Sequence, residues 1–278
     1  MRRVSAHGRP TPSADQQRWD QYGADRLLAL AADPKRFVIT APPYARMPYV
    51  QGLVGALGPV TGKRVLELGC GHGTLSVYLA KQGARVTGVD IGPRLVEAAG
   101  KLAELNGVDA EFARVDIKSL PFAAESFDVV VGLAVLHHLP ERDLACALAE
   151  THRVLRAGGI ASLVEPVEDS RAFDFLQSLV PAGTPGDTHY RPSRLNRRAW
   201  SRYVDTEDQR SLTTRELRRG GDAPWRSVTF TPYGLTSRLE RLLPARHRSA
   251  LWALDGVLLE RIPPVRRFCR TVLARYEK

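Results

Sequence analysis

Four residues in the first third of the chain have types and spacing suited to holding a nucleoside. Gly69, Gly71 and Gly73 alternate along a short loop after an apolar run, and Asp90 follows 17 residues after the last glycine. Glycines let a backbone turn sharply and approach a ligand closely, and the N–H groups that begin the next helix then face that ligand. An acid at the end of the following strand accepts hydrogen bonds from a ribose diol and disfavours a 2′-phosphate. The pattern therefore predicts a ligand that contains a nucleoside.

An acidic residue ahead of the glycines narrows the choice of ligand. The spacing is Glu67-x-Gly69-x-Gly71-x-Gly73, which departs from the G-x-G-x-x-G of nicotinamide and flavin sites. A carboxylate two residues before the first glycine would repel a pyrophosphate and suits a ligand that carries an ammonium group. S-Adenosylmethionine has an α-amino group, a sulfonium and a ribose. We therefore expect it as the cofactor, and not NAD.

A parallel sheet would bring these residues to one edge, and the sequence predicts such a sheet. Apolar runs alternate with helical patterns, and the expected strands cover 64–68, 85–89, 110–114, 127–132 and 159–165. Strands separated by helices form βαβ units with right-handed crossovers, and continuous apolar runs are typical of strands covered on both faces. We expect an α/β fold with a Rossmann-like doubly wound, mostly parallel sheet, N-terminal helices and a C-terminal appendage over the strand ends.

The remaining segments divide the chain into four parts. We expect a mobile tail over 1–13, an N-terminal helical lid over 14–58, a cofactor-binding Rossmann-like core over 59–169, and a substrate-facing insert with closing strands and helices over 170–278. In that last part, 225–234 is typical of a strand, whereas 235–262 and 265–276 have helical patterns.

Four segments of the expected core resemble the successive motifs of class I S-adenosylmethionine-dependent methyltransferases. They are VLELGCGHGTLSVYLA, VTGVDIGPRLVEAA, VDIKSLPFAAESFDVVVGLAVLHHL and RVLRAGGIASLVEP. The resemblance covers about 63–166 and holds in order, spacing and residue type. It implies an enzyme that transfers a methyl group from S-adenosylmethionine. The last third of the chain is loosely similar to the tails of small-molecule methyltransferases from bacterial secondary metabolism.

The same resemblance implies which residues hold the cofactor. The loop residues at the methionine and ribose parts are Glu67, Gly69, Cys70, Gly71 and Gly73, with Cys70 a small apolar member of the loop. Asp90 would hold the ribose hydroxyls, and Ile91 would lie against the adenine. Asp116 would bind the adenine amino group with Ile117 beside the ring, although an aspartate there also fits a simple turn. Leu133, after the fourth strand, would touch the methionine end.

Catalytic candidates must lie near the carboxyl ends of the strands. Methyl transfer from a sulfonium needs an aligned nucleophile and, for a hydroxyl or an amine, a base. Glu165 ends the fifth strand, where it would act as that base or pair with one of the many arginines. His137 and His138 follow the fourth strand, where one would cap the next helix, touch the cofactor or act in catalysis. No two of these candidates share a metal-ligand spacing, so we expect no metal site.

Charged and aromatic residues indicate the chemical class of the molecule that receives the methyl group. The net charge is +10, and the excess of Lys and Arg over Asp and Glu is nine in 151–278 but one in 1–150. These arginines form a solvated surface or hold an acidic substrate. They are scattered without a recognition motif, which disfavours nucleic acid. The aromatic residues that flank the motifs suggest an apolar, partly aromatic pocket; they are Trp19, Tyr22, Tyr44, Tyr49, Trp200 and Tyr203.

The sequence thus predicts methylation, at O, N or C, of a small apolar or aromatic secondary metabolite. C-methylation of a prenyl or prenyl-diphosphate substrate with Glu165 as base is an alternative. RNA or protein methylation and a non-catalytic cofactor-binding module are alternatives of another class. No apolar run is long enough to span a membrane, the N-terminal segment lacks the apolar stretch of a signal peptide, and three scattered cysteines fit a cytoplasmic protein. Whether the chain forms a homo-oligomer stays open.

Overall fold

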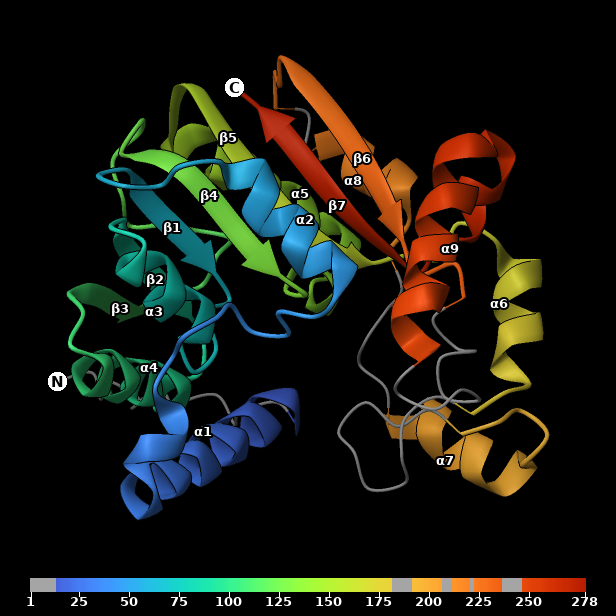
Figure 1. The fold of residues 1–278 in the computed structure, drawn as a ribbon, viewed down its shortest axis with the longest axis horizontal. Helices are drawn as coiled ribbons and strands as arrows, with labels where there is room; N and C mark the ends of the chain where they lie inside the picture. The colour runs from blue at the N-terminus through green and yellow to red at the C-terminus, as the bar shows by residue number, and fades with distance from the viewer. Residues whose placement is uncertain (1–13, 182–191, 207–211, 221–222, 237–246) are drawn as a thin grey trace, which may run out of the picture.

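A seven-stranded sheet forms the centre of the computed structural model, which describes residues 14–181, 192–206, 212–220, 223–236 and 247–278 (Figure 1). The strand order is β3-β2-β1-β4-β5-β7-β6, and β7 is antiparallel to both of its neighbours while the other neighbouring pairs are parallel. The strands are β1 (Arg64–Leu68), β2 (Arg85–Asp90), β3 (Ala110–Arg114), β4 (Phe127–Leu133), β5 (Leu155–Pro166), β6 (Ser227–Tyr233) and β7 (Thr271–Glu277). The predicted mostly parallel, doubly wound sheet is confirmed. Its order reverses direction between β1 and β4, and ligands of such sheets bind beyond the strand ends at that point.

Helices cover both faces of this sheet. They are α1 (Ala14–Ala32), η1 (Pro34–Phe37), α2 (Pro48–Leu57), α3 (Thr74–Lys81), α4 (Pro93–Asn106), η2 (Leu136–His138), α5 (Glu141–Val154), α6 (Arg171–Ser178), α7 (Arg197–Thr206), α8 (Thr214–Arg219), α9 (Arg248–Arg261) and η6 (Pro263–Phe268). Neighbouring residues of β1 show the two layers. Val65 packs with Leu53 of α2 and Leu79 of α3, and Leu66 belongs to the cluster that holds Leu148 of α5.

One predicted helix is wrong. The segment 265–276 contains η6 and the start of β7, and β7 lies between β5 and β6. Val272, Ala274 and Tyr276 face one apolar cluster while Leu273 faces the other. Because both faces of β7 are covered, its apolar residues do not alternate with polar ones, and periodicity does not separate such a strand from a buried helix.

The two long N-terminal helices have different positions. α1 packs on α4, and the approach is so close that a Cβ added at Gly23 would lie 2.8 Å from the Arg94 backbone. α2 lies on a face of the sheet, where Leu53 and Leu57 pack with Val164 and Leu273. Of the expected lid over 14–58, α1 lies near the carboxyl edge, whereas α2 is part of the core packing (Figure 1). The expected tail 1–13 lies outside the described residues.

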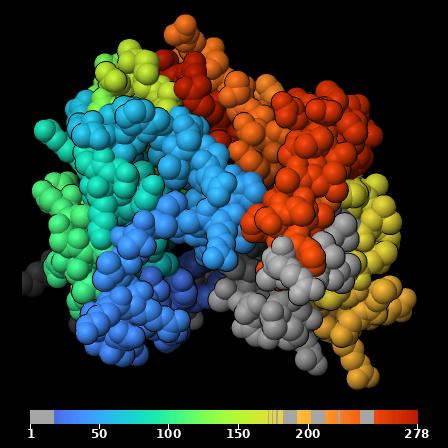
Figure 2. All heavy atoms as spheres, in the orientation of Figure 1, coloured from blue at the N-terminus to red at the C-terminus, as the bar shows by residue number. Residues whose placement is uncertain are grey.

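The segment after 170 adds to the same sheet. β6 and β7 extend it beyond β5, and α6, α7 and α9 gather on that side of the molecule (Figure 1). Figure 2 shows the N-terminal helices and α9 flanking a hollow near the middle of this face.

Candidate active site

The glycine loop between β1 and α3 adopts left-handed backbone at each predicted glycine. The φ angles are +60° at Gly69, +52° at Gly71 and +82° at Gly73. A Cβ added at Gly69 would clash with the Val135 side chain, and one at Gly73 would lie 2.8 Å from Ala99 Cβ. A Cβ added at Gly71 would meet no atom within 4 Å. Two of the glycines therefore admit neighbouring protein atoms, whereas Gly71 borders open space.

Asp90, at the end of β2, connects two parts of this edge. Its Oδ2 accepts a hydrogen bond of 2.9 Å from the Gly71 N–H, and its Oδ1 accepts one of 2.8 Å from the Gly92 N–H. Burial raises the pKa of this carboxyl, and the backbone donors oppose that shift. Each carboxylate oxygen has a second lone pair, so Asp90 could accept further hydrogen bonds from a bound diol.

Glu67 lies beneath the loop. Its side chain is 3% exposed, and the Ser76 hydroxyl of α3 donates a short hydrogen bond to its Oε2. Burial raises the pKa of Glu67 to about 8, so the Glu67 carboxyl is protonated in most molecules near neutral pH. The expected partnership of Glu67 with a ligand ammonium group therefore requires that ligand binding removes this proton.

The residues expected at the adenine end differ in accessibility. Ile91 follows β2 and is 48% exposed, so it offers apolar surface. Asp116 follows β3, and its Oδ1 accepts a hydrogen bond of 3.0 Å from the Lys118 N–H, which is the simple turn that the sequence also allowed. The Asp116 side chain is 43% exposed and keeps acceptor capacity. Ile117 is 8% exposed and packs in the core. This position does not fit the expected contact of Ile117 with the adenine ring of a bound cofactor.

The strand end after β4 is strained. Leu133 ends the strand and packs with the apolar cluster that holds Leu53 of α2. Ala134 follows with a φ of +58°. Left-handed backbone at a non-glycine residue costs on the order of 1–3 kcal/mol and is common at functional sites. A hydrogen bond of 2.7 Å from the Ala134 N–H to the Val164 carbonyl supports the turn. Val135, next along the chain, is the residue that occupies the space left by Gly69.

This edge fits S-adenosylmethionine in several respects. Gly71 borders open space, Ile91 exposes an apolar side chain, and Asp90 retains acceptor capacity. Thr74 begins α3, and its buried hydroxyl has no hydrogen-bond partner among the described residues. An unpartnered buried polar atom beside a glycine loop is a place for a ligand atom to bind. Cys70 is 6% exposed, as expected of a small apolar loop member.

Glu165 is placed differently from both roles that the sequence suggested. Its side chain has no exposed surface. Oε1 accepts hydrogen bonds of 2.9 and 2.8 Å from the Val135 and Leu136 N–H groups, and Oε2 lies 3.2 Å from the His137 N and 3.0 Å from His137 Nδ1. A base that faces the substrate does not fit this burial, and the partner of the carboxylate is a histidine rather than an arginine. Glu165 holds the turn that carries His137.

Two histidines of this edge contact α1. The ring of Trp19 meets that of His138 edge-on at a centroid distance of 5.4 Å, and Tyr22 meets His72 at 5.8 Å. The His137 and His138 rings lie 4.0 Å apart. Burial, helped by the charge of Arg26, lowers the pKa of His72 to about 4, so His72 is neutral near pH 7. His72 was not among the predicted site residues. Its place between Gly71 and Gly73 is the sequence signal that marks it as a residue of the cofactor loop.

The other expected aromatic residues are spread over the molecule. Tyr44 is 64% exposed. Burial raises the pKa of the neighbouring Tyr22, and Tyr44 adds to that rise. Tyr49 belongs to a separate cavity near α9, and Trp200 of α7 stacks with the guanidinium of Arg194, which precedes that helix. The side chain of Tyr203 lies outside the described residues.

The described residues hold no group of three His, Cys, Asp or Glu side chains placed to bind a metal ion. Every helix found in the ranges given above is too short or too polar to cross a membrane.

Known proteins that resemble this chain in sequence include methyltransferases, in agreement with a cofactor site at this edge of the sheet. The Methyltransferase domain family matches residues 65–159. The ubiquinone biosynthesis O-methyltransferase of Hahella chejuensis is 33% identical over 167 residues, which cover 56% of this chain and 68% of that enzyme. The phthiotriol/phenolphthiotriol dimycocerosates methyltransferase of Mycobacterium leprae is 42% identical over 102 residues, or 36% of each chain.

The match with the ubiquinone enzymes spans about two thirds of their length, since it covers 66% of the Pseudomonas entomophila enzyme. Among solved structures, the [4+2]-cyclase SpnF has a TM-score of 0.57 at 21% identity and covers 98% of this chain and 99% of its own, which supports the fold alone. The relatives and the domain match establish an enzyme that depends on S-adenosylmethionine. This chain belongs to the class I S-adenosylmethionine-dependent methyltransferases.

Proposed function

We propose that the protein methylates a hydroxyl group on a small apolar or aromatic metabolite. The contact between Glu165 and His137 carries this proposal. Three backbone N–H groups donate to the Glu165 oxygens, so these oxygens are acceptors, and His137 Nδ1 is then the donor. A proton on Nδ1 leaves Nε2 with a lone pair, which is the form of imidazole that takes a proton from a hydroxyl.

Each residue of this pair has a separate task. His137 accepts the hydroxyl proton, and Glu165 fixes the imidazole tautomer and stabilises the positive charge that then forms. When bound, S-adenosylmethionine supplies a methyl group on a sulfonium, an electrophile with a good leaving group. The protein's remaining contribution is to align the oxygen and exclude water. Burial of Glu165 and the 8% exposure of His137 suit that exclusion.

The relatives support oxygen as the acceptor atom. The ubiquinone enzymes are named O-methyltransferases, and the mycobacterial relative is named for a phthiotriol or phenolphthiotriol. An apolar or aromatic acceptor also suits the edge-on contact of Trp19 with His138, because α1 then brings an aromatic side chain against the ring that neighbours the proposed base, His137. C-methylation with Glu165 as base is not favoured, since that carboxyl is fully buried and already has four partners.

Product analysis tests the acceptor atom. The full chain would be incubated with methyl-labelled S-adenosylmethionine and, separately, with catechol, benzylamine and total RNA. We expect label in the methyl ether of catechol and background label in the other two. Label confined to the amine or to RNA would contradict O-methylation, while label in none of them with intact cofactor binding would reject phenolic acceptors.

A further inference from the structure

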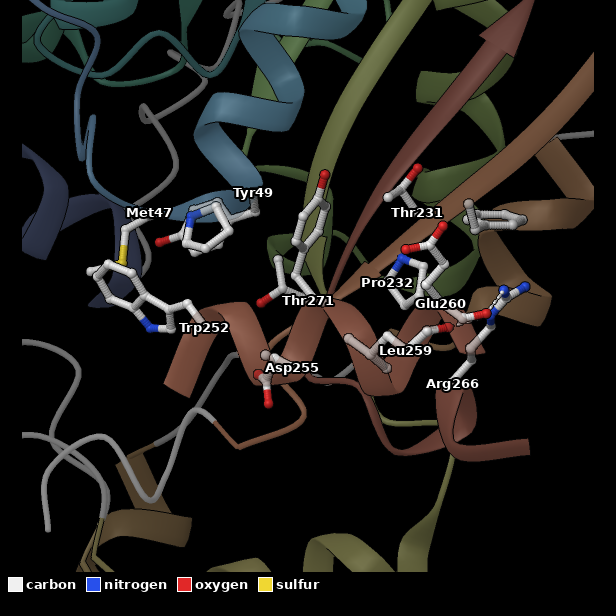
Figure 3. Close-up of a pocket in the computed structure, with 15 residues that line it drawn as sticks. Met47, Tyr49, Thr231, Pro232, Trp252, Asp255, Leu259, Glu260, Arg266 and Thr271 are labelled. Atoms are coloured by element: carbon white, nitrogen blue, oxygen red, sulfur yellow. Dashed lines mark hydrogen bonds between the residues drawn. The ribbon is translucent and has the colours of Figure 1, made fainter. Parts of the chain in front are cut away.

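A cavity of about 470 Å³ lies between α2, α9 and the ends of β6 and β7 (Figure 3). Its volume is within the range of about 300–1,000 Å³ that is common for small-molecule sites. None of the residues expected to bind the cofactor lines it. It is therefore a second space, separate from the glycine loop.

The walls of the cavity are apolar at one end and charged at the other. Met47 and Trp252 lie side by side at the first end, and Tyr49 comes next to them (Figure 3). Glu260 and Arg266 lie at the opposite end (Figure 3). Both charged residues are exposed, so this end opens toward solvent.

Two charged side chains along the cavity, Asp255 and Arg266, have partners within the protein. Both carboxylate oxygens of Asp255 accept from the Thr236 N–H at 3.1 Å. Arg266 donates through Nε to the Leu259 carbonyl at 2.7 Å and through Nη2 to the Glu260 carbonyl at 3.1 Å. With these two charges engaged, the apolar side chains of Met47, Trp252 and Leu259 favour a hydrocarbon group, whose burial is driven by loss of water-exposed apolar surface.

Strand register places the cavity and Glu165 at the same end of the sheet but on opposite faces. Thr271 lines the cavity and pairs with Pro166 of β5, and the next pair joins Val272 to Glu165. Because successive side chains of a strand point to opposite faces, Glu165 points away from the face that Thr271 presents to the cavity. A molecule whose hydroxyl lies at His137 would therefore pass around the carboxyl end of β5 to place a substituent in this space.

We propose that the cavity binds a hydrocarbon chain attached to the acceptor. This inference rests on the proposed O-methylation, which gives the reactive end of the same molecule. The chain enters between Met47 and Trp252, passes Leu259, and points toward the exposed charged end. The cavity would then select acceptors by the length of the substituent rather than by the ring that is methylated.

Gly256 offers a way to fill the cavity without disturbing its walls. Together with Trp252 and Leu259, it lies on the face of α9 that lines the cavity. A Cβ added at Gly256 meets no atom within 4 Å, so Gly256→Leu should fold and place its branches in the cavity. The matched control is Gly100→Leu, a helical position in α4 with equally open surroundings.

Binding of 4-hexylresorcinol and resorcinol to the full chain, with S-adenosylhomocysteine present, tests the proposal by calorimetry. We expect the hexyl compound to bind at least about tenfold tighter than resorcinol to the unaltered protein and to Gly100→Leu. In Gly256→Leu that advantage should fall below about threefold, while resorcinol affinity stays unchanged.

Two results would overturn the cavity assignment: no advantage of the hexyl chain in the unaltered protein, or the same advantage in Gly256→Leu. Because binding is measured without turnover, the proposed function fails separately. A hexyl advantage that depends on Gly256, together with no methylation of either phenol, would retain the cavity and reject phenolic O-methylation.

Discussion

Gly71→Ala should leave the protein folded and remove most of its affinity for the cofactor. Gly71 has a φ of +52°, and a Cβ there would meet no atom within 4 Å. Left-handed backbone at alanine costs about 1–2 kcal/mol, which a domain of ordinary stability tolerates. The added methyl group would project into the open space that we assign to the cofactor. We expect at least about tenfold weaker binding of S-adenosylhomocysteine, or about 1.4 kcal/mol.

Gly107→Ala is the matched control for this variant. Gly107 ends α4 with a φ of +62° and also has no atom within 4 Å of an added Cβ. Denaturant unfolding should give similar losses of stability for the two variants, whereas calorimetric titration should show weakened binding for Gly71→Ala alone. Equal cofactor affinity in both variants would refute the placement of the cofactor against Gly71.

Three further predictions concern the carboxyl groups of the site. Asp90→Ala should weaken S-adenosylhomocysteine binding by about 1–3 kcal/mol, since a charge-assisted contact is lost; the exposed Asp109→Ala is the calorimetric control, and unchanged affinity would rule out the ribose contact. Burial raises the pKa of Glu67 to about 8, so the folded chain keeps a proton that the unfolded chain releases above its ordinary pKa of 4.5. Unfolding free energy should therefore fall as pH rises between these values, by at most about 1.4 kcal/mol per pH unit, and Glu67→Gln should flatten that slope in denaturant titrations. Glu165→Gln places an amide donor against backbone donors and should cost about 1–3 kcal/mol of stability; an unchanged melting temperature would contradict its role in holding the turn.

The parts of the fold that sequence predicted best are those with local start and stop signals. α4 begins and ends at such signals, because Pro93 suits the first turn of a helix and Gly107 adopts the left-handed conformation that ends it. β7 was missed because its apolar character comes from cover on both faces, which only the assembled sheet provides. The position of α2 on a face of the sheet likewise depends on tertiary packing that its own pattern does not specify.

The site likewise contains residues that the sequence could predict and contacts that only the assembled fold creates. The glycine loop and Asp90 could be predicted because backbone geometry and strand ends depend on short stretches of chain. The partners of Glu165 could not, since His137 is 28 positions away and meets it only when β4 and β5 are adjacent. The cavity beside α9 combines residues from α2, β6, β7 and α9 with no motif in common, so sequence spacing carried no signal for it.

The turnover number of His137→Gln with catechol tests the proposed catalysis most directly. It would be measured with cofactor and acceptor both saturating, beside the control His152→Gln, whose ring packs on Trp225 away from the glycine loop. We predict that kcat falls roughly 10²-fold or more in His137→Gln, with S-adenosylhomocysteine affinity within a few-fold of the unaltered protein, and stays near normal in His152→Gln. A His137→Gln protein that binds cofactor and turns over at the normal rate would contradict the assignment of His137 as the base.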